Sequence, residues 1–290
     1  SLYVGSGGLR VELNWDHQGE GADNHYTDDA GASGGGKGPD LDLHVHRPGF
    51  KTVWFNGPMG MKGDDCFYGN CTAASFVMTM PGAPNWFTAD QYPHNWTRQE
   101  PYNPNDPIYT CYNAPRGAGD EWKMFKKGCH NPRLDLDNIT CDNTVSDPQS
   151  ELFCAPENVN IDEPPYGLWT RIGVHYFGHC FNGDLHPQIT IYCGGAQVAQ
   201  LGGSGYNAPV TFPASSCNAS SDDDSDNAFW LVADVMAIQG VCGEVDCIVQ
   251  PLYADAASKT PLISTGGKAK SQFGPACPPA PPDAGGPGCN

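Results

Sequence analysis

Hydrophobic and polar residues alternate along this chain in short runs, and residues 40–46 form the clearest of them. Leu41, Leu43 and Val45 occupy every second position of this run. Successive side chains of a β-strand point to opposite faces, so the pattern predicts a strand with one face on a hydrophobic core. The residues of its other face are Asp40, Asp42, His44 and His46.

Similar runs recur over most of the chain, separated by residues that favour turns. Gly194 and Gly195 suit a tight hairpin turn between two of them. Many short strands with little helix predict an all-β fold, an antiparallel β-sandwich of the immunoglobulin-like or jelly-roll-like kind with long disulfide-pinned loops. The further strands are predicted at residues 9–15, 52–55, 167–177, 189–193, 196–201, 229–238 and 248–253.

The same pattern predicts a single β-sandwich domain over residues 1–265. Within it, residues 56–133 have no long periodic run and are rich in Gly, Pro, Asn and aromatic residues, so we expect a loop excursion there. Residues 266–290 are rich in Pro and Gly, which is typical of a linker or an extended arm. No apolar run is long enough to cross a membrane.

Cysteine content indicates the cellular location of the protein, and net charge restricts the class of its partners. The chain has 13 cysteines without paired C-x-x-C motifs, which favours disulfides and a secreted or cell-surface location. Because the number of cysteines is odd, at least one is not paired within this chain. The net charge of −18 argues against nucleic acid as a partner, because its phosphates would be repelled. The connectivity stays open, although three near-neighbour pairs are plausible: Cys66 with Cys71, Cys242 with Cys247, and Cys277 with Cys289.

Acidic residues recur at a spacing that suits a metal site. Asp40 and Asp42 project from one side of the predicted strand, and a predicted loop at 134–138 repeats the Asp-x-Asp spacing. Ca²⁺ binds six to eight oxygen ligands, and clustered carboxylates repel one another unless a cation neutralises them. We therefore predict a calcium site formed by Asp40, Asp42, Asp135, Asp137 and Glu157.

Other interpretations of these polar residues stay open. The acids could be exposed strand and turn residues paired with Arg133 or Arg171. His44 and His46, together with His175 from a neighbouring strand, could chelate zinc or copper. Alternatively, these histidines could be packed and hydrogen-bonded core residues.

Several short motifs follow one another in a set order: an Asp-Leu-Asp-Leu-His strand, an aromatic hairpin, an Asp-Cys-aromatic segment, a Leu-Asp-x-Asp loop, Pro-Glu-Asn and Val-His-Tyr. Over most of residues 9–240 this series resembles a family of secreted bacterial β-sandwich modules. The resemblance implies an immunoglobulin-like or jelly-roll fold in surface or secreted proteins, often beside other domains. The long 56–133 excursion and the many cysteines depart from the family pattern, so a family role could be modified here.

We predict an extracellular, calcium-stabilised, non-enzymatic binding, adhesion or surface-assembly module. Its partner would be a glycan, a protein surface or another copy of the chain. Trp86, Trp96 and Trp122 could stack on sugar rings, or form a hydrophobic cluster under the loop. Two alternatives are a structural subunit of an extracellular filament or layer, and a zinc- or copper-dependent hydrolase or oxidase. The sequence has no His-Glu-x-x-His motif, phosphate-binding loop or nucleophile elbow.

Overall fold

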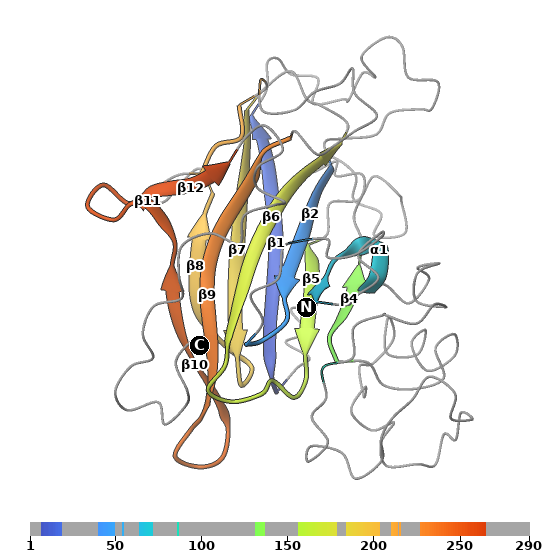
Figure 1. Ribbon diagram of the computed structural model, residues 1–290, viewed down its shortest axis with the longest axis vertical. Coiled ribbons are helices and arrows are strands. Elements are labelled where there is room, and N and C mark those ends of the chain that lie inside the picture. Colours follow the sequence, from blue (N-terminus) through green and yellow to red (C-terminus); the bar gives the residue numbers. More distant parts are fainter. Residues whose placement is uncertain are drawn as a thin grey trace.

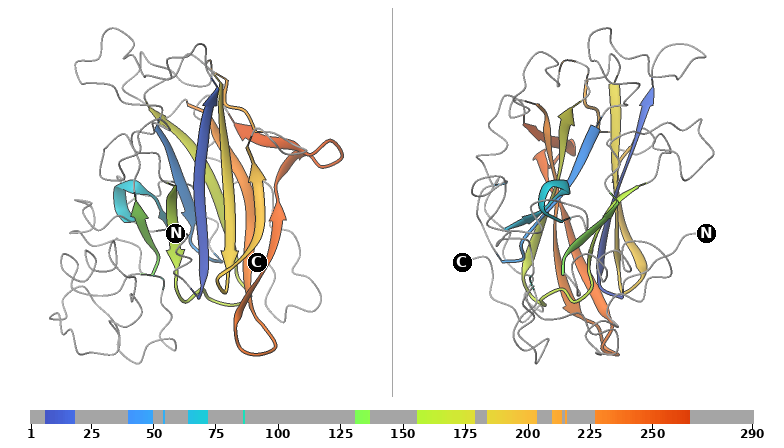
Figure 2. Two further views of the ribbon diagram at one scale, coloured as in Figure 1. Left: turned by 180° about the vertical axis from the view of Figure 1, so that it is seen from behind. Right: turned by 90° about the vertical axis from the view of Figure 1, so that its right-hand side faces the viewer.

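The structure, a computed structural model, is nearly all β and consists of two antiparallel sheets packed against each other. Figure 1 shows the sheets face on, and the right-hand view of Figure 2 shows them as two layers. The predicted β-sandwich is therefore confirmed. The residues that the structure describes are 7–18, 40–49, 54, 64–71, 86, 131–136, 156–178, 184–203, 210–213, 215 and 227–264.

The first sheet, called sheet A, has β1 at its centre. Its apolar positions Leu9, Val11 and Leu13 alternate and are buried, as the sequence pattern predicts. The β7–β8 hairpin turns at Gly194 and Gly195, both with positive φ angles that glycine adopts without strain. In spatial order sheet A contains β4 (Arg133–Leu136), β5 (Glu157–Ile161), β1 (Leu9–Gln18), β7 (Asp184–Cys193) and β8 (Ala196–Gly202).

The second sheet, sheet B, carries the strand with the alternating pattern. In spatial order it contains β11 (Tyr253–Asp255), β12 (Thr260–Ser264), β9 (Phe229–Gln239), β6 (Trp169–Gly178), β2 (Asp40–His46) and β3 (Asp65–Cys66). β10 (Val245–Pro251) pairs with β9, and the short helix α1 (Tyr68–Cys71) follows β3. No helix in the described part of the chain has the length and hydrophobicity needed to cross a membrane.

The main hydrophobic core lies between the sheets. Leu41, Leu43 and Val45 of β2 are fully buried in it, and each such side chain contributes roughly 1.5–3 kcal/mol to folding. A second cluster, formed by Trp54, Phe229, Leu231 and Leu252, is separate from this core. Every residue of β2 is buried, so its polar face is not exposed to solvent, contrary to the half-buried strand that the alternation predicts. One reason is that the rings of Trp54, Phe67 and Phe229 cover the histidines of that face.

Two local predictions differ from the structure. Of the predicted strand at 52–55 only Trp54 is described, and it lies in a turn; the antiparallel neighbours of β2 are β6 and β3. Residues 133–136 form strand β4 rather than a loop, because they pair with β5. The Asn131–Pro132 peptide bond before β4 is cis.

Two disulfides are described, which is compatible with an extracellular location. The predicted Cys66–Cys71 bond is confirmed. The predicted Cys242–Cys247 pair is wrong, because Cys247 of β10 bonds Cys193 of β7 and so links sheet B to sheet A. Cys242 lies in the exposed turn after β9 and is free. The Cys277–Cys289 pair and the arm at 266–290 lie outside the described residues.

Candidate metal centre

Three buried carboxylates from both sheets converge beside β2. One oxygen from each of Asp40, Asp42 and Glu157 lies within 4.8 Å of the others. Asp40 and Asp42 belong to β2 of sheet B, whereas Glu157 begins β5 of sheet A. We call these three residues the acidic cluster. It brings together acids that are more than a hundred residues apart in the sequence.

The position of Glu157 follows from strand register. Glu157 pairs with Leu13 of β1, and directly paired residues point to the same face of a sheet. Since Leu13 is part of the core, Glu157 also faces the interior, where none of its surface is exposed. Its Oε2 atom accepts a hydrogen bond from the backbone N–H of Leu43 at 2.9 Å. Sheet A thus contacts the backbone of β2 through a buried carboxylate.

Electrostatics make a cluster of this kind unstable when every member is ionised. At 4.8 Å and an effective dielectric constant of about 20, two like unit charges repel by about 3.5 kcal/mol. Three such pairs amount to about 10 kcal/mol, comparable with the whole stability of an ordinary domain. Protons, basic side chains or a metal ion must therefore compensate the charge, and three carboxylates together are a ligand set that suits a divalent cation.

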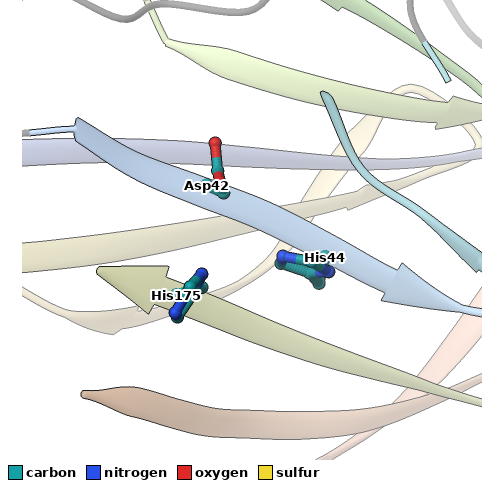
Figure 3. Close-up of side chains that lie close together, drawn as sticks. All are labelled: Asp42, His44 and His175. Carbon is teal, nitrogen blue, oxygen red and sulfur yellow. The ribbon is translucent and has the colours of Figure 1, made fainter. Parts of the chain in front are cut away.

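A second group, which contains two imidazoles, adjoins the acidic cluster. Ligand atoms of Asp42, His44 and His175 also lie within 4.8 Å of one another. Asp42 and His175 are directly paired across β2 and β6, and His44 follows Asp42 on the same face of β2. We call this group the imidazole cluster; Figure 3 shows Asp42 and His44 on β2 beside His175 on β6. Asp42 belongs to both clusters.

A carboxylate and a shell of aromatic rings surround His44. Its Nδ1 atom lies 3.1 Å from Oδ2 of Asp65 in β3. Phe67 stacks on the imidazole with ring centroids 5.1 Å apart, while Trp54 and Phe229 approach at 5.8 and 5.5 Å. Phe229 also stacks on His175 at 5.8 Å. The imidazole cluster therefore lies under aromatic side chains.

Gly173 makes this arrangement possible. It lies directly opposite His44 on β6. A Cβ atom built at this position would lie 2.4 Å from Cε1 of Phe229 and 3.3 Å from Cζ2 of Trp54. A side chain at residue 173 would thus occupy the place of the rings that cover the histidines.

The other predicted metal ligands are only partly placed. Asp135 lies on β4, beside the β5 strand that carries Glu157, but its side chain is outside the described part of the structure. Asp137 also lies outside the described residues. His46 is buried, yet it is not a member of either cluster; its Nδ1 atom lies 3.3 Å from the carbonyl oxygen of Arg47.

Of the three tryptophans that could stack on sugar rings, the structure describes Trp86. Trp86 is 3% exposed and packs in the main hydrophobic core, so its ring does not face solvent. Trp96 and Trp122 lie outside the described residues. For Trp86 the position agrees with the alternative of a hydrophobic cluster under the loop.

The arginines considered as partners of the acids lie in other ion pairs of the described structure. Arg133 bonds Asp162, and Arg171 forms a two-pronged pair with Asp234 in which both N–O distances are 2.6 Å. Arg171 and Asp234 are directly opposite on β6 and β9. Neither of these ion pairs involves a carboxylate of the acidic cluster.

Sequence reasoning missed one residue of the centre, Asp65. Asp65 belongs to the Asp-Cys-aromatic segment, and nothing local in the sequence shows that β3 lies beside β2. The neighbouring Asp64 lies 4.0 Å from the Arg47 guanidinium. Burial lowers the pKa of Arg47, and the Asp64 carboxylate opposes this shift.

Comparison of the chain with protein-family models, with curated proteins and with solved structures finds no match. The resemblance to secreted bacterial β-sandwich modules therefore stays a prediction. Any functional conclusion must be based on the geometry of the centre.

Proposed function

We propose that this protein is an extracellular, non-enzymatic binding or surface-assembly module in which Ca²⁺, held by Asp40, Asp42 and Glu157, ties the two sheets together. One observation carries this proposal: three buried carboxylates, contributed by both sheets, converge within 4.8 Å. A divalent ion among them would turn repulsion between the sheets into attraction. The ion would then act as a cross-link, in the way a disulfide does.

The ligand chemistry favours calcium for the acidic cluster. Carboxylates are hard oxygen ligands, and Ca²⁺ accepts six to eight of them in flexible geometry, with carbonyl groups and water completing the set. Mg²⁺ keeps several of its waters and demands strict octahedral geometry, which suits a buried three-carboxylate site less well. Asp135, on the strand beside β5, remains a candidate for a further ligand.

Burial of the cluster favours a structural role for this ion. Asp40 and Asp42 are 3% and 1% exposed, and Glu157 has no exposed surface. A catalytic metal keeps an open position for water or substrate, whereas a buried ion holds strands in place. The surface that meets a glycan or protein partner would then be supported by the ion but would not include it.

Calcium binding is tested by calorimetry on the full chain after treatment with a chelator. We expect saturable heat for about one Ca²⁺ per chain. At a free calcium concentration of about 100 times Kd the ion stabilises the fold by about 2.7 kcal/mol, which corresponds to a rise in Tm of about 5–10 °C. Absence of both heat and Tm shift in protein that is folded by circular dichroism would remove the proposal.

A second candidate function, a chain-linked structural subunit, is favoured by the tip of the β9–β10 hairpin. Cys242 is exposed and free, and the adjacent Val241 is fully exposed at 103% relative accessibility. An exposed thiol in an oxidising compartment can form a disulfide with another chain. Non-reducing electrophoresis should then show a dimer that disappears in Cys242→Ser, whereas a monomer under oxidising conditions would contradict this function.

A further inference from the structure

We propose that Asp42, His44 and His175 form a second metal site, for a divalent cation of the zinc class, which shares the Asp42 carboxylate with the calcium site. The inference goes beyond the proposed calcium site and depends on it only through Asp42. The two sites together would form one buried centre with two ions of different chemistry.

Strand register brings the three ligands together. Asp42 and His175 are directly paired across β2 and β6, and His44 is two residues after Asp42 on the same face. Their ligand atoms lie within 4.8 Å of one another. Ligands that each contact one ion at about 2.0–2.2 Å are at most about 4.4 Å apart, so a small inward movement of these side chains would close the site around the ion.

The ligand types select the ion. Two imidazoles with one carboxylate suit Zn²⁺ and related transition metals, whereas Ca²⁺ prefers oxygen. The acidic cluster and the imidazole cluster thus differ in chemistry although they adjoin. A carboxylate has two oxygens, so Asp42 can contribute one to each ion.

Asp65 supplies the partner that metal-binding histidines usually have. Its carboxylate lies 3.1 Å from Nδ1 of His44, and neither side chain is exposed. An ionised carboxylate accepts hydrogen bonds only, so Nδ1 carries the proton and the lone pair of His44 is on Nε2, where a metal can bind it. A carboxylate–histidine–metal arrangement fixes the ring and raises its basicity.

Two divalent ions would match the charge of the buried acids around this centre. The four buried acids Asp40, Asp42, Asp65 and Glu157 carry four negative charges when ionised. Two divalent cations with neutral imidazoles supply four positive charges. The aromatic shell of Phe67, Trp54 and Phe229 around His44 keeps the dielectric constant low, which strengthens each of these attractions.

The experiment uses Co²⁺ as a visible probe of the zinc site in the full chain. Chelator-treated protein is first saturated with Ca²⁺ and then titrated with Co²⁺. We expect about one Co²⁺ per chain, with visible absorption bands that Zn²⁺ abolishes by competition. In the wild-type protein, proton NMR should show paramagnetically shifted imidazole N–H signals, a readout that does not depend on whether a variant folds.

Substitutions at the proposed ligands test which side chains bind Co²⁺. His44→Gln and His175→Gln should each lose Co²⁺ binding, and Asp65→Asn should weaken it about 10–100-fold. His186→Gln is the matched control, because His186 is partly exposed on β7 of the other sheet; its Co²⁺ affinity should equal that of the wild type. Two results would overturn the proposal: absence of shifted imidazole signals in the wild-type protein, or wild-type Co²⁺ affinity in His44→Gln and His175→Gln. Either result would mean that the histidines are packed core residues.

Failure of this inference is distinguishable from failure of the calcium proposal. Glu157→Gln should lose calcium heat while it keeps the cobalt spectrum, and His175→Gln should show the reverse. Asp42→Asn should weaken the binding of both ions. If Asp42→Asn changes only calcium binding, the proposal that Asp42 contacts both ions is wrong.

Discussion

Glu157 accepts a hydrogen bond from the backbone N–H of Leu43 at 2.9 Å, and this bond joins the two sheets of the sandwich. The carboxylate points inward beside Leu13, a position where an apolar side chain would be expected. An acid is stable at such a place when something compensates its charge.

Glu157→Gln should have opposite effects with and without calcium. Gln keeps an oxygen that can accept the Leu43 N–H but removes one of three neighbouring charges. In chelator the variant should therefore have a higher Tm than the wild type, because repulsion decreases. In excess Ca²⁺ the wild type should have the higher Tm, because it alone binds the ion tightly.

The matched control for this variant is Glu12→Gln. Glu12 lies on β1 of the same sheet, is partly exposed and pairs with Arg10 at 2.6 Å. Because Glu12 is not part of the acidic cluster, any change in Tm should be the same in both buffers. The same order of Tm values for Glu157→Gln and wild type in both buffers would show that no ion binds there.

Gly173→Ala should disturb both stability and the imidazole cluster. The new Cβ would lie 2.4 Å from Phe229, whose ring stacks on His175. Overpacking of this kind costs about 1–3 kcal/mol, measured by chemical denaturation. We also expect altered Co²⁺ bands, since the ring that covers the histidines must move. Gly7→Ala, where a Cβ meets nothing within 4 Å, serves as the control.

Asp234→Asn should destabilise the fold more than replacement of the whole ion pair. The side chains of Arg171 and Asp234 are 1% and 2% exposed, so removal of the negative partner leaves a buried guanidinium. Loss of one partner of such a pair typically costs about 3–5 kcal/mol, whereas apolar residues at both positions can be nearly neutral. The double variant Arg171→Met/Asp234→Leu should therefore be more stable than Asp234→Asn in urea unfolding. The opposite order would mean that this pair contributes net stability.

Removal of the Cys193–Cys247 disulfide should cost more than removal of Cys66–Cys71. The first closes a sequence separation of 54 residues and joins the sheets, whereas the second closes a separation of 5. Loop-closure entropy assigns about 4 kcal/mol to the longer loop and about 2 kcal/mol to the shorter. Paired Cys→Ala variants, compared by chemical denaturation, test the order. Equal losses would indicate that strain or residual structure outweighs loop entropy.

The sequence by itself determined the fold class and most strands. Alternation at Leu41, Leu43 and Val45 predicted β2, and Gly194-Gly195 predicted the β7–β8 hairpin. These features are local, because side-chain period and turn chemistry depend on neighbouring residues. The acidic residues Asp40, Asp42 and Glu157 were also recognised as potential ligands from their type and spacing.

Only the tertiary structure decided which of these residues meet. It brings Glu157 to β2 from the other sheet, separates His46 from the imidazole cluster, and adds Asp65 through β3. It also pairs Cys247 with Cys193 and covers the polar face of β2 with aromatic rings. Such contacts depend on sheet order and register, which arise from packing between segments that are distant in the chain and leave no local pattern.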